Sequence, residues 1–281
     1  MPGMAGYEWI TFTSDYGLDG HFVGVCHGVM ARVAPRARVL DVSHAVAAQD
    51  VRQGAVVLAQ AVPYLPRAVH LAVVDPGVGT GRGMVAVEAG GQVLVGPDNG
   101  LLLWAAEALG GVEAAHALEN PAFRLAPVSR TFHGRDVFAP AAAHLAAGVD
   151  PAELGPAVDS ERLVRLERAA ARAGGGGVAG RVVAVDHFGN LDLDLRGDDL
   201  QGGGLAAGDR LEVRVGGRVH RAVLAETFAS VPAGELLLHE NAFGSLELAV
   251  NLGRAADRLG ARRGDRVELA PVPEPDREGG G

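Results

Sequence analysis

The sequence predicts an α/β N-terminal domain with a mainly parallel sheet, followed by a smaller C-terminal antiparallel β-barrel-like domain. Three observations predict this fold. Before residue 173, short apolar runs alternate with helical patterns. A run of four glycines lies within residues 173–180, and the sequence after it is β-rich with glycine turns. Because glycine runs form flexible linkers, we expect one domain at residues 1–172 and a second at residues 173–281.

The length and composition indicate a folded protein with a sizeable core. The chain has 281 residues, of which 48% are hydrophobic, and no apolar run approaches the ~20 residues that a membrane span requires. Residues Met1–Gly6 do not have the pattern of a secretory signal. Cys26 is the single cysteine, which excludes an internal disulfide bond, so we expect a cytoplasmic protein.

The charged residues exclude several classes of function. A formal net charge of −9 disfavours a nucleic-acid partner and mildly favours a cationic ligand. The sequence contains no lysine. Schiff-base catalysis and the phosphate-binding P-loop both need a lysine, so both are excluded.

In the N-terminal domain, the apolar patterns predict strands and helices in alternation. We expect strands at Trp9–Thr13, Val39–Val42, Ala68–Val74 and Met84–Ala89, and helices at Phe22–Val33, from the capping residue Asp50 to about Val62, at Asn99–Leu109 and at Val137–Ala147. Such alternation implies a mainly parallel sheet covered on both faces, whose ligands lie beyond the carboxyl ends of strands. Asp15 and Asp75 follow two of these ends.

The second domain has alternating or β-rich patterns. We expect strands at Arg181–Val185, Leu191–Leu195, Arg210–Val215, Arg218–Leu224 and Leu246–Val250, and a short helix near Leu252–Leu259.

The segment DPGVGTGRG, from Asp75 to Gly83, is similar to a dinucleotide-binding loop but does not fit one. The third glycine position of that fingerprint falls on Arg82 or Met84, and a strand pattern follows instead of a helix. The glycines still allow the backbone to approach a ligand closely. A turn between two strands is an equally good interpretation of this segment by itself.

Several other polar residues are candidates for a site, and each has an ordinary structural alternative. Asp15 suits the two hydroxyls of a ribose but also suits a cap. His133 lies in a loop, where histidines are more often structural, and Asp136 is expected to cap the helix that follows. Asn190 lies in a typical turn segment, DHFGN.

In the segment NAFGSLELAVN, Ser245 and Glu247 lie on one face of a strand, which faces either a ligand or solvent. His21, His27 and His44 lie near Asp15 and Asp41 in the sequence, but neither the HExxH motif nor zinc-type spacing is present. We therefore expect no metal and no cofactor.

Seven segments in the same order resemble one family, the S-adenosylmethionine hydroxide adenosyltransferases, also called S-adenosylmethionine hydrolases, which are relatives of fluorinating and chlorinating enzymes. The resemblance covers Ile10 to Asn251. Its segments are TSDYG (Thr13–Gly17), DVSHAVAAQDVRQGA (Asp41–Ala55), VVDPGVGTGR (Val73–Arg82), GPDNG (Gly96–Gly100), FHGRDVFAP (Phe132–Pro140), DHFGN (Asp186–Asn190) and GSLELAVN (Gly244–Asn251).

This resemblance implies an enzyme that hydrolyses S-adenosyl-L-methionine to adenosine and L-methionine. It implies a homotrimer whose active sites lie between the N-domain of one subunit and the C-domain of the next. The water-activating residues would be Asp75, Arg82 and His133. The substrate-binding residues would be Asp15, Asp75, Asn190, Asn241, Ser245, Glu247 and Val250.

Three alternative functions remain open at the level of the sequence. The first is a halogenase that uses chloride or fluoride on the same substrate. In the fluorinating relatives, the positions of Asp75 and His133 are tyrosines and that of Gly134 is a serine, so the carboxylate here favours water over an anion. The second is a non-catalytic sensor of S-adenosylmethionine or adenosine, and the third is a metal-dependent hydrolase.

Overall fold

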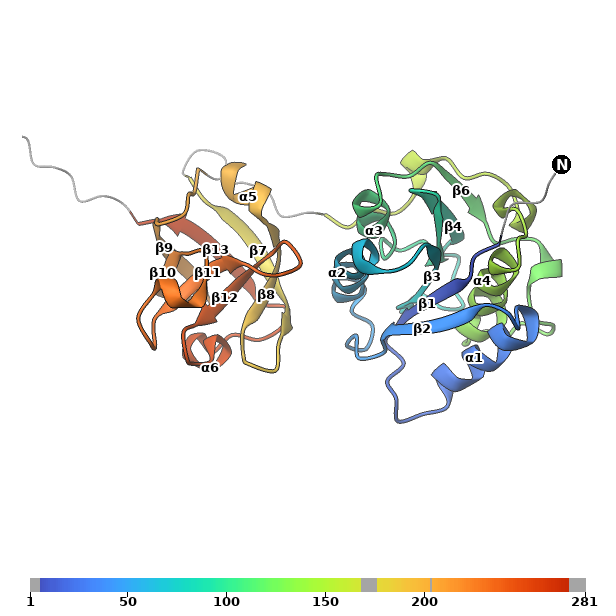
Figure 1. Cartoon of the computed structure of the whole chain (residues 1–281), viewed down its shortest axis with the longest axis horizontal. Coiled ribbons are helices and arrows are strands. Elements are labelled where there is room, and N and C mark those ends of the chain that lie inside the picture. Colours follow the sequence, from blue (N-terminus) through green and yellow to red (C-terminus); the bar gives the residue numbers. More distant parts are fainter. Residues whose placement is uncertain (1–5, 168–175, 203, 273–281) are drawn as a thin grey trace, which may run out of the picture. The chain divides into compact units, whose positions relative to one another are not determined.

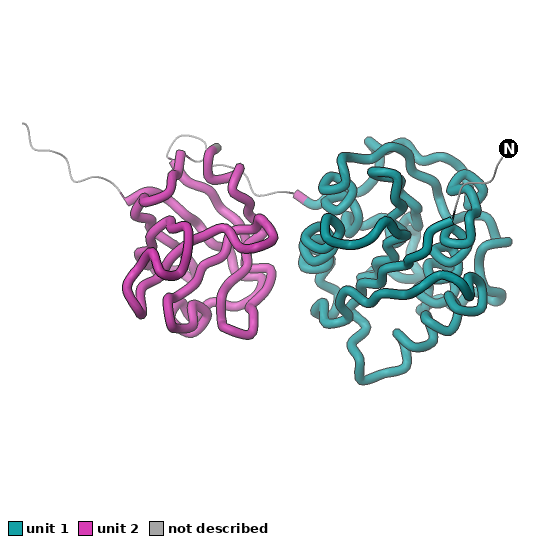
Figure 2. Tube along the Cα trace, viewed as in Figure 1, with its two compact units in different colours: residues 1–166 teal, residues 167–281 magenta. Residues whose placement is uncertain are grey.

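The structure, a computed structural model, describes residues 6–167, 176–202 and 204–272 (Figure 1). The chain divides into two compact units, Met1–Leu166 and Glu167–Gly281 (Figure 2). The predicted boundary between residues 172 and 173 lies outside the described residues. Unit 1 and unit 2 are described separately below.

The described part of unit 1 contains a six-stranded sheet with strand order β2-β1-β3-β5-β4-β6. Its strands are β1 (Trp9–Ser14), β2 (Arg38–Ser43), β3 (Ala68–Val73), β4 (Met84–Ala89), β5 (Gln92–Pro97) and β6 (Ala114–Ala117). Strands β2, β1, β3 and β5 are parallel to one another, and β4 pairs antiparallel with β5 and β6. The predicted mainly parallel sheet is therefore confirmed.

Helices cover both faces of this sheet, as its all-buried central strand β3 requires. Helix α1 packs with α4, and α2 packs with α3 on the opposite face (Figure 1). The helices are α1 (Phe22–Val33), α2 (Val51–Ala61), α3 (Leu103–Ala108) and α4 (Ala139–Ala146). Asp50 caps α2 as predicted, since its side chain accepts a hydrogen bond of 2.9 Å from the Gln53 backbone N–H.

Two helix starts differ from the sequence-based expectation. Helix α3 begins at Leu103, and not at Asn99, because Gly100 has a φ of +93° that a helix does not tolerate. The predicted cap at Asp136 is also wrong. Asp136 lies inside a π-helical turn at Gly134–Phe138, where its buried carboxylate pairs with Arg135 and accepts from the Ser129 backbone N–H at 2.8 Å.

The described part of unit 2 is a closed barrel with strand order β10-β11-β12-β8-β7-β13-β9. The strands are β7 (Val178–Val185), β8 (Leu191–Arg196), β9 (Arg210–Val215), β10 (Arg218–Leu224), β11 (Leu236–Glu240), β12 (Ser245–Val250) and β13 (Arg266–Pro271). Leucine and valine side chains fill the interior. The pairing is antiparallel as predicted, except that β10 and β11 are parallel.

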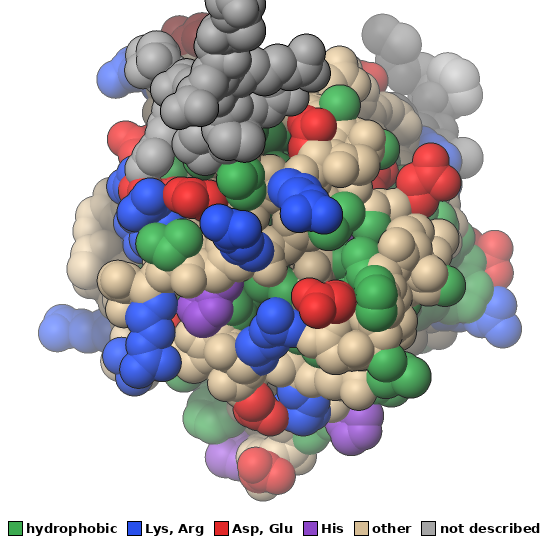
Figure 3. Space-filling view, turned by 90° about the vertical axis from the view of Figure 1, so that its left-hand side faces the viewer, with side chains coloured by type: hydrophobic (Ala, Val, Ile, Leu, Met, Phe, Trp, Pro, Cys, Tyr) green, Lys and Arg blue, Asp and Glu red, His purple; other side chains and the backbone are tan. Residues whose placement is uncertain are grey.

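Two short helices accompany the barrel, α5 (Gly197–Gly202) and α6 (Ala255–Leu259), and the second confirms the helical piece expected near Leu252–Leu259. On the face of unit 2 shown in Figure 3, arginine and acidic side chains are interspersed and are not separated by sign. None of the helices in the described part of the chain has the length and apolar character that crossing a lipid bilayer requires.

Candidate active site

A cavity of about 380 Å³ in unit 1 brings together three of the residues singled out in the sequence. Asp15 follows β1, Asp75 follows β3 after one residue, and His133 precedes the π-helical turn. All three line the cavity. Carboxyl ends of parallel strands meet at one edge of a sheet, which explains why two aspartates 60 positions apart share one opening.

The glycine-rich loop after β3 places Arg82 beside this cavity. Gly79 has a φ of +79°, and a Cβ at this position would lie 2.6 Å from the Arg130 carbonyl oxygen. Only glycine fits both conditions, so the loop packs directly against the segment that leads to His133. The sequence-based interpretation of this segment as a non-dinucleotide loop agrees with the strand, β4, that follows it.

Asp75, Arg82 and His133 form one hydrogen-bonded group. Arg82 Nε donates to Asp75 Oδ1 at 2.9 Å, and Arg82 Nη2 donates to the second carboxylate oxygen. The same Nη2 lies 3.0 Å from His133 Nδ1. The Asp75 and Arg82 side chains are only 7% and 10% exposed, so solvent screens this bidentate pair weakly.

The hydrogen bond from Arg82 fixes the tautomer of His133. A guanidinium has donors only, so His133 Nδ1 accepts the hydrogen bond, and the neutral ring carries its proton on Nε2. Burial, and next the positive charge of Arg82, lower the pKa of His133 below 6.5. His133 is therefore a neutral imidazole at pH 7 with its lone pair directed at Arg82.

Aromatic side chains form the apolar wall of the cavity and were not identified from the sequence. The rings of Tyr16, Phe22 and Phe132 lie 5.2–5.8 Å apart, centroid to centroid. Phe138, fully buried, lies 5.3 Å from the Arg82 guanidinium carbon and supports that side chain from below. Tyr16 and Phe132 belong to the motifs already quoted, whereas Phe22 has no local sequence signal.

Tyr16 and Gly134 are in close contact inside the site. A Cβ at Gly134 would lie 2.0 Å from the Tyr16 hydroxyl oxygen, far inside contact distance. Burial raises the pKa of the Tyr16 phenol, so the hydroxyl stays protonated. The tyrosine hydroxyl therefore occupies the volume that any side chain at position 134 would need.

Asp15 is held in place by the backbone of a neighbouring loop. Its Oδ2 accepts a hydrogen bond of 2.8 Å from the Gln49 backbone N–H. Gln49 has a φ of +67°, an uncommon conformation for a residue with a side chain. This backbone geometry directs the N–H at the carboxylate and fixes the aspartate at the cavity wall.

In unit 2, Asn190 is buried in the turn between β7 and β8. Its side-chain amide and its backbone N–H both donate to the Asp186 carboxylate, at 3.0 and 2.8 Å. The DHFGN segment is thus the turn that the sequence suggested, with the asparagine side chain held by Asp186. The resemblance placed Asn190 at the substrate without indicating this support from Asp186.

Asn241 and Glu247 meet at a buried polar cluster on the barrel. Asn241 Nδ2 donates to Asp192 Oδ1 at 2.8 Å, and Glu247 Oε1 lies 3.0 Å from His239 Nε2. Burial, followed by the Glu247 charge, raises the pKa of Asp192 to about 6. Asp192 and His239 had not been identified from the sequence. Asp192 alternates with leucines along β8, as the residues of a solvated strand face do, and His239 lies near the end of β11 after three leucines.

The remaining two predicted residues also lie on β12. Ser245 is buried, 7% exposed, and so is Glu247, which excludes a solvated strand face as the explanation of this polar pair. Val250 is 6% exposed and packs into the barrel core. Among the described residues, one group converges in a manner suited to a metal ion, His27, Asp41 and His44, and none of the three lines the cavity.

The chain is similar to several proteins over nearly its whole length. It is 54% identical over 266 residues to a protein named (R)-S-adenosyl-L-methionine hydrolase from Salinispora tropica, covering 95% of this chain and 99% of that one. A protein of the same name from Thermus thermophilus is 44% identical, with 92% and 98% covered. A protein named fluorinase from Actinoplanes sp. is 29% identical, with 86% and 90% covered.

A solved structure and two family models agree with these sequence similarities. A crystal structure of an uncharacterized conserved protein from Thermotoga maritima matches with a TM-score of 0.82 and 37% identity, covering 93% of this chain and 99% of that one. The family model of the SAM hydroxide adenosyltransferase N-terminal domain matches residues 10–155, and that of the C-terminal domain matches residues 180–268. This chain therefore belongs to the SAM hydroxide adenosyltransferase family.

Proposed function

We propose that this protein hydrolyses S-adenosyl-L-methionine to adenosine and L-methionine by attack of water on the 5′ carbon. The observation that carries the proposal is the hydrogen-bonded group of Asp75, Arg82 and His133 at the edge of a cavity in unit 1. The names of the similar proteins from Salinispora tropica and Thermus thermophilus support the same activity.

The substrate itself makes one half of this reaction easy. Its sulfonium leaves as the neutral thioether of methionine and takes the electron pair of the C5′–S bond, so that side needs no general acid. The new bond joins the water oxygen to C5′, and in-line attack inverts that carbon. The difficulty is the nucleophile, since bulk water has a pKa near ~15.7. The chain must therefore orient a water and remove its proton.

The three side chains have separate roles in this proposal. Arg82 stays cationic, orients the water and stabilises the hydroxide character that develops. Asp75 fixes the guanidinium through two hydrogen bonds. His133 accepts the proton at Nδ1, the nitrogen with a lone pair, and in doing so it exchanges its hydrogen bond from Arg82 for the proton. The proton then passes to solvent from the imidazolium.

Substrate binding is assigned to both units. Asp15 binds the ribose hydroxyls, and Asn190, Asn241, Ser245, Glu247 and Val250 bind the adenine and methionine parts. We further propose a homotrimer in which unit 1 of one subunit and unit 2 of the next form each site. Large exposed apolar side chains in unit 2, Phe188, Phe243 and Leu252 at 71%, 51% and 90% exposure, are consistent with burial against a neighbouring subunit.

This chemistry uses no metal and no cofactor, because the substrate is already activated and the chain supplies the proton acceptor. The net charge of −9 favours approach of the cationic sulfonium over that of a nucleic acid. The single cysteine is compatible with a cytoplasmic location.

Chromatography of the products tests the proposal. Purified protein is incubated with S-adenosyl-L-methionine in H₂¹⁸O with EDTA, and we expect methionine and adenosine that carries ¹⁸O at the 5′ hydroxyl. Binding without any released methionine would instead identify a sensor. A kcat at saturating substrate that falls to zero in EDTA and returns with a divalent ion would identify a metal-dependent hydrolase.

Halide as the nucleophile is tested in the same assay. We expect that added chloride or fluoride yields no 5′-halo-5′-deoxyadenosine, because the Asp75 carboxylate at the cavity repels an anion. A halogenated nucleoside that exceeds adenosine would overturn the assignment of water as the nucleophile.

A further inference from the structure

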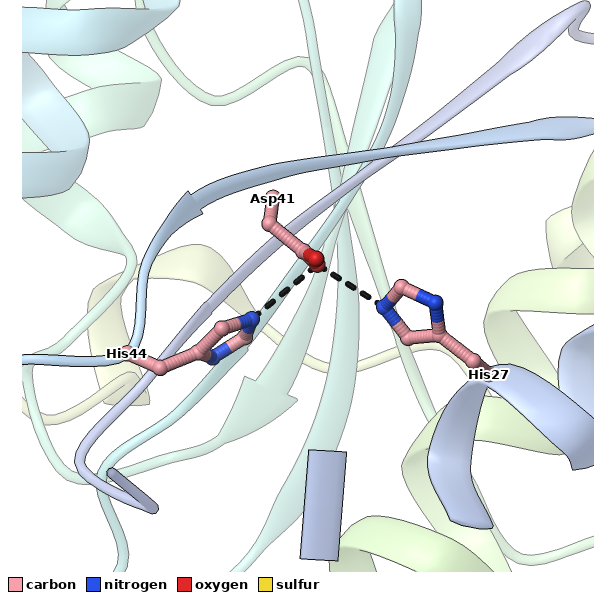
Figure 4. A group of neighbouring side chains, drawn as sticks. All are labelled: His27, Asp41 and His44. Atoms are coloured by element: carbon pink, nitrogen blue, oxygen red, sulfur yellow. Dashed lines mark hydrogen bonds and ion pairs between the residues drawn. The ribbon is translucent and has the colours of Figure 1, made fainter. Parts of the chain in front are cut away.

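Three potential metal ligands converge at the edge of the sheet in unit 1. They are separate from the trio Asp75, Arg82 and His133 that the proposed reaction uses. His27 comes from α1, Asp41 from the edge strand β2, and His44 directly follows β2 (Figure 4). Their ligand atoms all lie within 4.8 Å of one another. Asp41 Oδ1 is 2.8 Å from His27 Nε2 and 3.0 Å from His44 Nε2.

His44 has a buried nitrogen that faces a carboxylate oxygen without a geometrically regular hydrogen bond. Its side chain is 2% exposed, and Nε2 lies 3.0 Å from Asp41 Oδ1, an ion-pair contact that does not have the geometry of a hydrogen bond. Leaving a buried polar nitrogen unpaired costs free energy. This nitrogen faces the same carboxylate oxygen that His27 contacts, so a cation at this point would satisfy it (Figure 4).

The surroundings of His44 match those of a metal-bound imidazole. Its Nδ1 lies 2.7 Å from the Ser14 hydroxyl, and a proton donated there leaves the Nε2 lone pair available. Imidazoles that bind metals regularly donate their second N–H in this way. Phe12, fully buried, contacts both rings, with centroids 6.1 Å from His27 and 4.7 Å from His44, and thereby fixes their positions.

We propose that His27 Nε2, His44 Nε2 and Asp41 Oδ1 bind one divalent transition-metal cation, with Zn²⁺ as the expected ion. Two imidazoles and a carboxylate are a donor set that suits Zn²⁺, whereas Mg²⁺ and Ca²⁺ prefer oxygen ligands. His27 and Asp41 are 35% and 41% exposed, which gives the ion a path from solvent and leaves a position for a water ligand.

The role of this cation is structural. It joins α1 to the edge strand β2, and through the hydrogen bond of His44 to Ser14 it supports the loop that presents Asp15 to the cavity. Proton transfer at His133 does not involve it. The metal site is therefore tested by metal binding and thermal unfolding, and the proposed hydrolysis by the products that form.

Calorimetric titration tests the site directly. Full-length, tag-free protein is stripped with EDTA, dialysed and titrated with ZnCl₂, and we expect one bound ion per chain. His27→Gln and Asp41→Asn should each weaken binding at least ~100-fold, and Ser14→Ala should weaken it ~10–100-fold through the second hydrogen bond of His44. His21→Ala, an exposed histidine next to α1, is the matched control and should bind Zn²⁺ like the parent.

Thermal unfolding provides a second readout that does not depend on activity. Zn²⁺ should raise the Tm of the parent and of His21→Ala, but not that of His27→Gln or Asp41→Asn, and Mg²⁺ should have no effect. Equal melting temperatures in EDTA show that all four proteins are folded. Equal Zn²⁺ affinity in the parent and both ligand variants, or no saturable binding up to ~100 μM, overturns the proposal.

Discussion

Arg82 connects the other two members of the trio, since it donates to Asp75 and to His133 at once. A change at any of the three residues therefore alters the hydrogen bonding of the other two. Burial, together with the positive charge of Arg82, also keeps His133 at rest in the neutral form that a proton acceptor must have.

His133→Ala should lower kcat ~10²–10⁴-fold with little change in KM, because the residue acts on the proton of water and not on substrate binding. Steady-state kinetics of methionine release measures this, with His220→Ala in unit 2 as the matched control. Unchanged kcat would remove His133 from the mechanism.

The pH dependence of kcat follows from the lowered pKa of His133. The neutral imidazole is the active form, so kcat should be constant near neutrality and fall as the pH drops through a midpoint below 6.5. The residual activity of His133→Ala should lack this acid limb. A midpoint above 6.5 would contradict the environment described for this histidine.

Asp15→Ala should mainly weaken substrate binding, because the carboxylate contacts ribose hydroxyls in the proposed complex and no reacting atom. Calorimetry with S-adenosyl-L-methionine measures the affinity, and Asp19→Ala, an exposed aspartate on the same loop, serves as the control. An affinity equal to that of the parent would contradict the ribose role.

At the residue scale, the sequence predicted Asp15, Asp75 and His133 as residues of the site, and the structure places all three at one cavity. It did so through the order of seven motifs, since each residue alone is compatible with a turn. The sequence did not predict the position of Phe22 at the cavity or the contact between His44 and Ser14. Both features depend on side chains that only tertiary folding brings together.

At the scale of elements, His70 on β3 connects three neighbouring strands through its side chain. Its Nδ1 lies 2.8 Å from the Thr11 hydroxyl on β1, and its Nε2 lies 3.0 Å from Gln92 Oε1 on β5. Burial lowers the pKa of His70 from 6.5 to about 4. The folded sheet therefore requires a neutral imidazole in its interior.

The stability of unit 1 should consequently fall as the pH decreases from 6.5 to 4. Over this window the unfolded chain binds a proton at His70 and the folded chain does not. This difference lowers the free energy of unfolding by up to ~3 kcal/mol. Urea unfolding at pH 7.5 and 4.5 should show a smaller loss in His70→Gln than in the parent. Identical losses in the two proteins would contradict this role for His70.

Element-scale prediction succeeded for α1 but missed four strands, β5, β6, β11 and β13, of which β13 has an alternating pattern. Helix α1 begins and ends as expected, because its apolar face and Pro35 define it. Strand β6 has the sequence AAHA, and alanine has little preference for strands. Strand β11 begins with three leucines that are all buried, so it lacks the alternation by which a strand is recognised.

At the scale of the whole molecule, the predicted catalytic trio lies in unit 1, and most of the predicted substrate-binding residues lie in unit 2. The change from an alternating to a β-rich pattern was sufficient to predict two different architectures. The closed barrel confirms the barrel-like domain that the sequence predicted, but the pattern was not sufficient to predict its strand order or the parallel pair β10–β11, because strand order depends on contacts distant in the sequence.

Mixing two inactive variants tests whether each site is shared between subunits. Co-expressed Asp75→Ala and Asn190→Ala chains should recover activity at about a quarter of the sites in random trimers, since some interfaces then combine two intact units. Sedimentation should give three times the chain mass of 28.8 kDa. Mixtures as inactive as either variant alone would show that each chain forms its site by itself.

The contact between Tyr16 and Gly134 has a consequence for how this site evolves. Because the tyrosine hydroxyl fills the space of a side chain at position 134, the two positions are epistatic. Selection from a library randomised at position 134 alone should return glycine. Larger residues should appear there only in lineages that first acquire a shorter side chain at position 16, so the order of mutations decides which active sites descendants of this sequence reach.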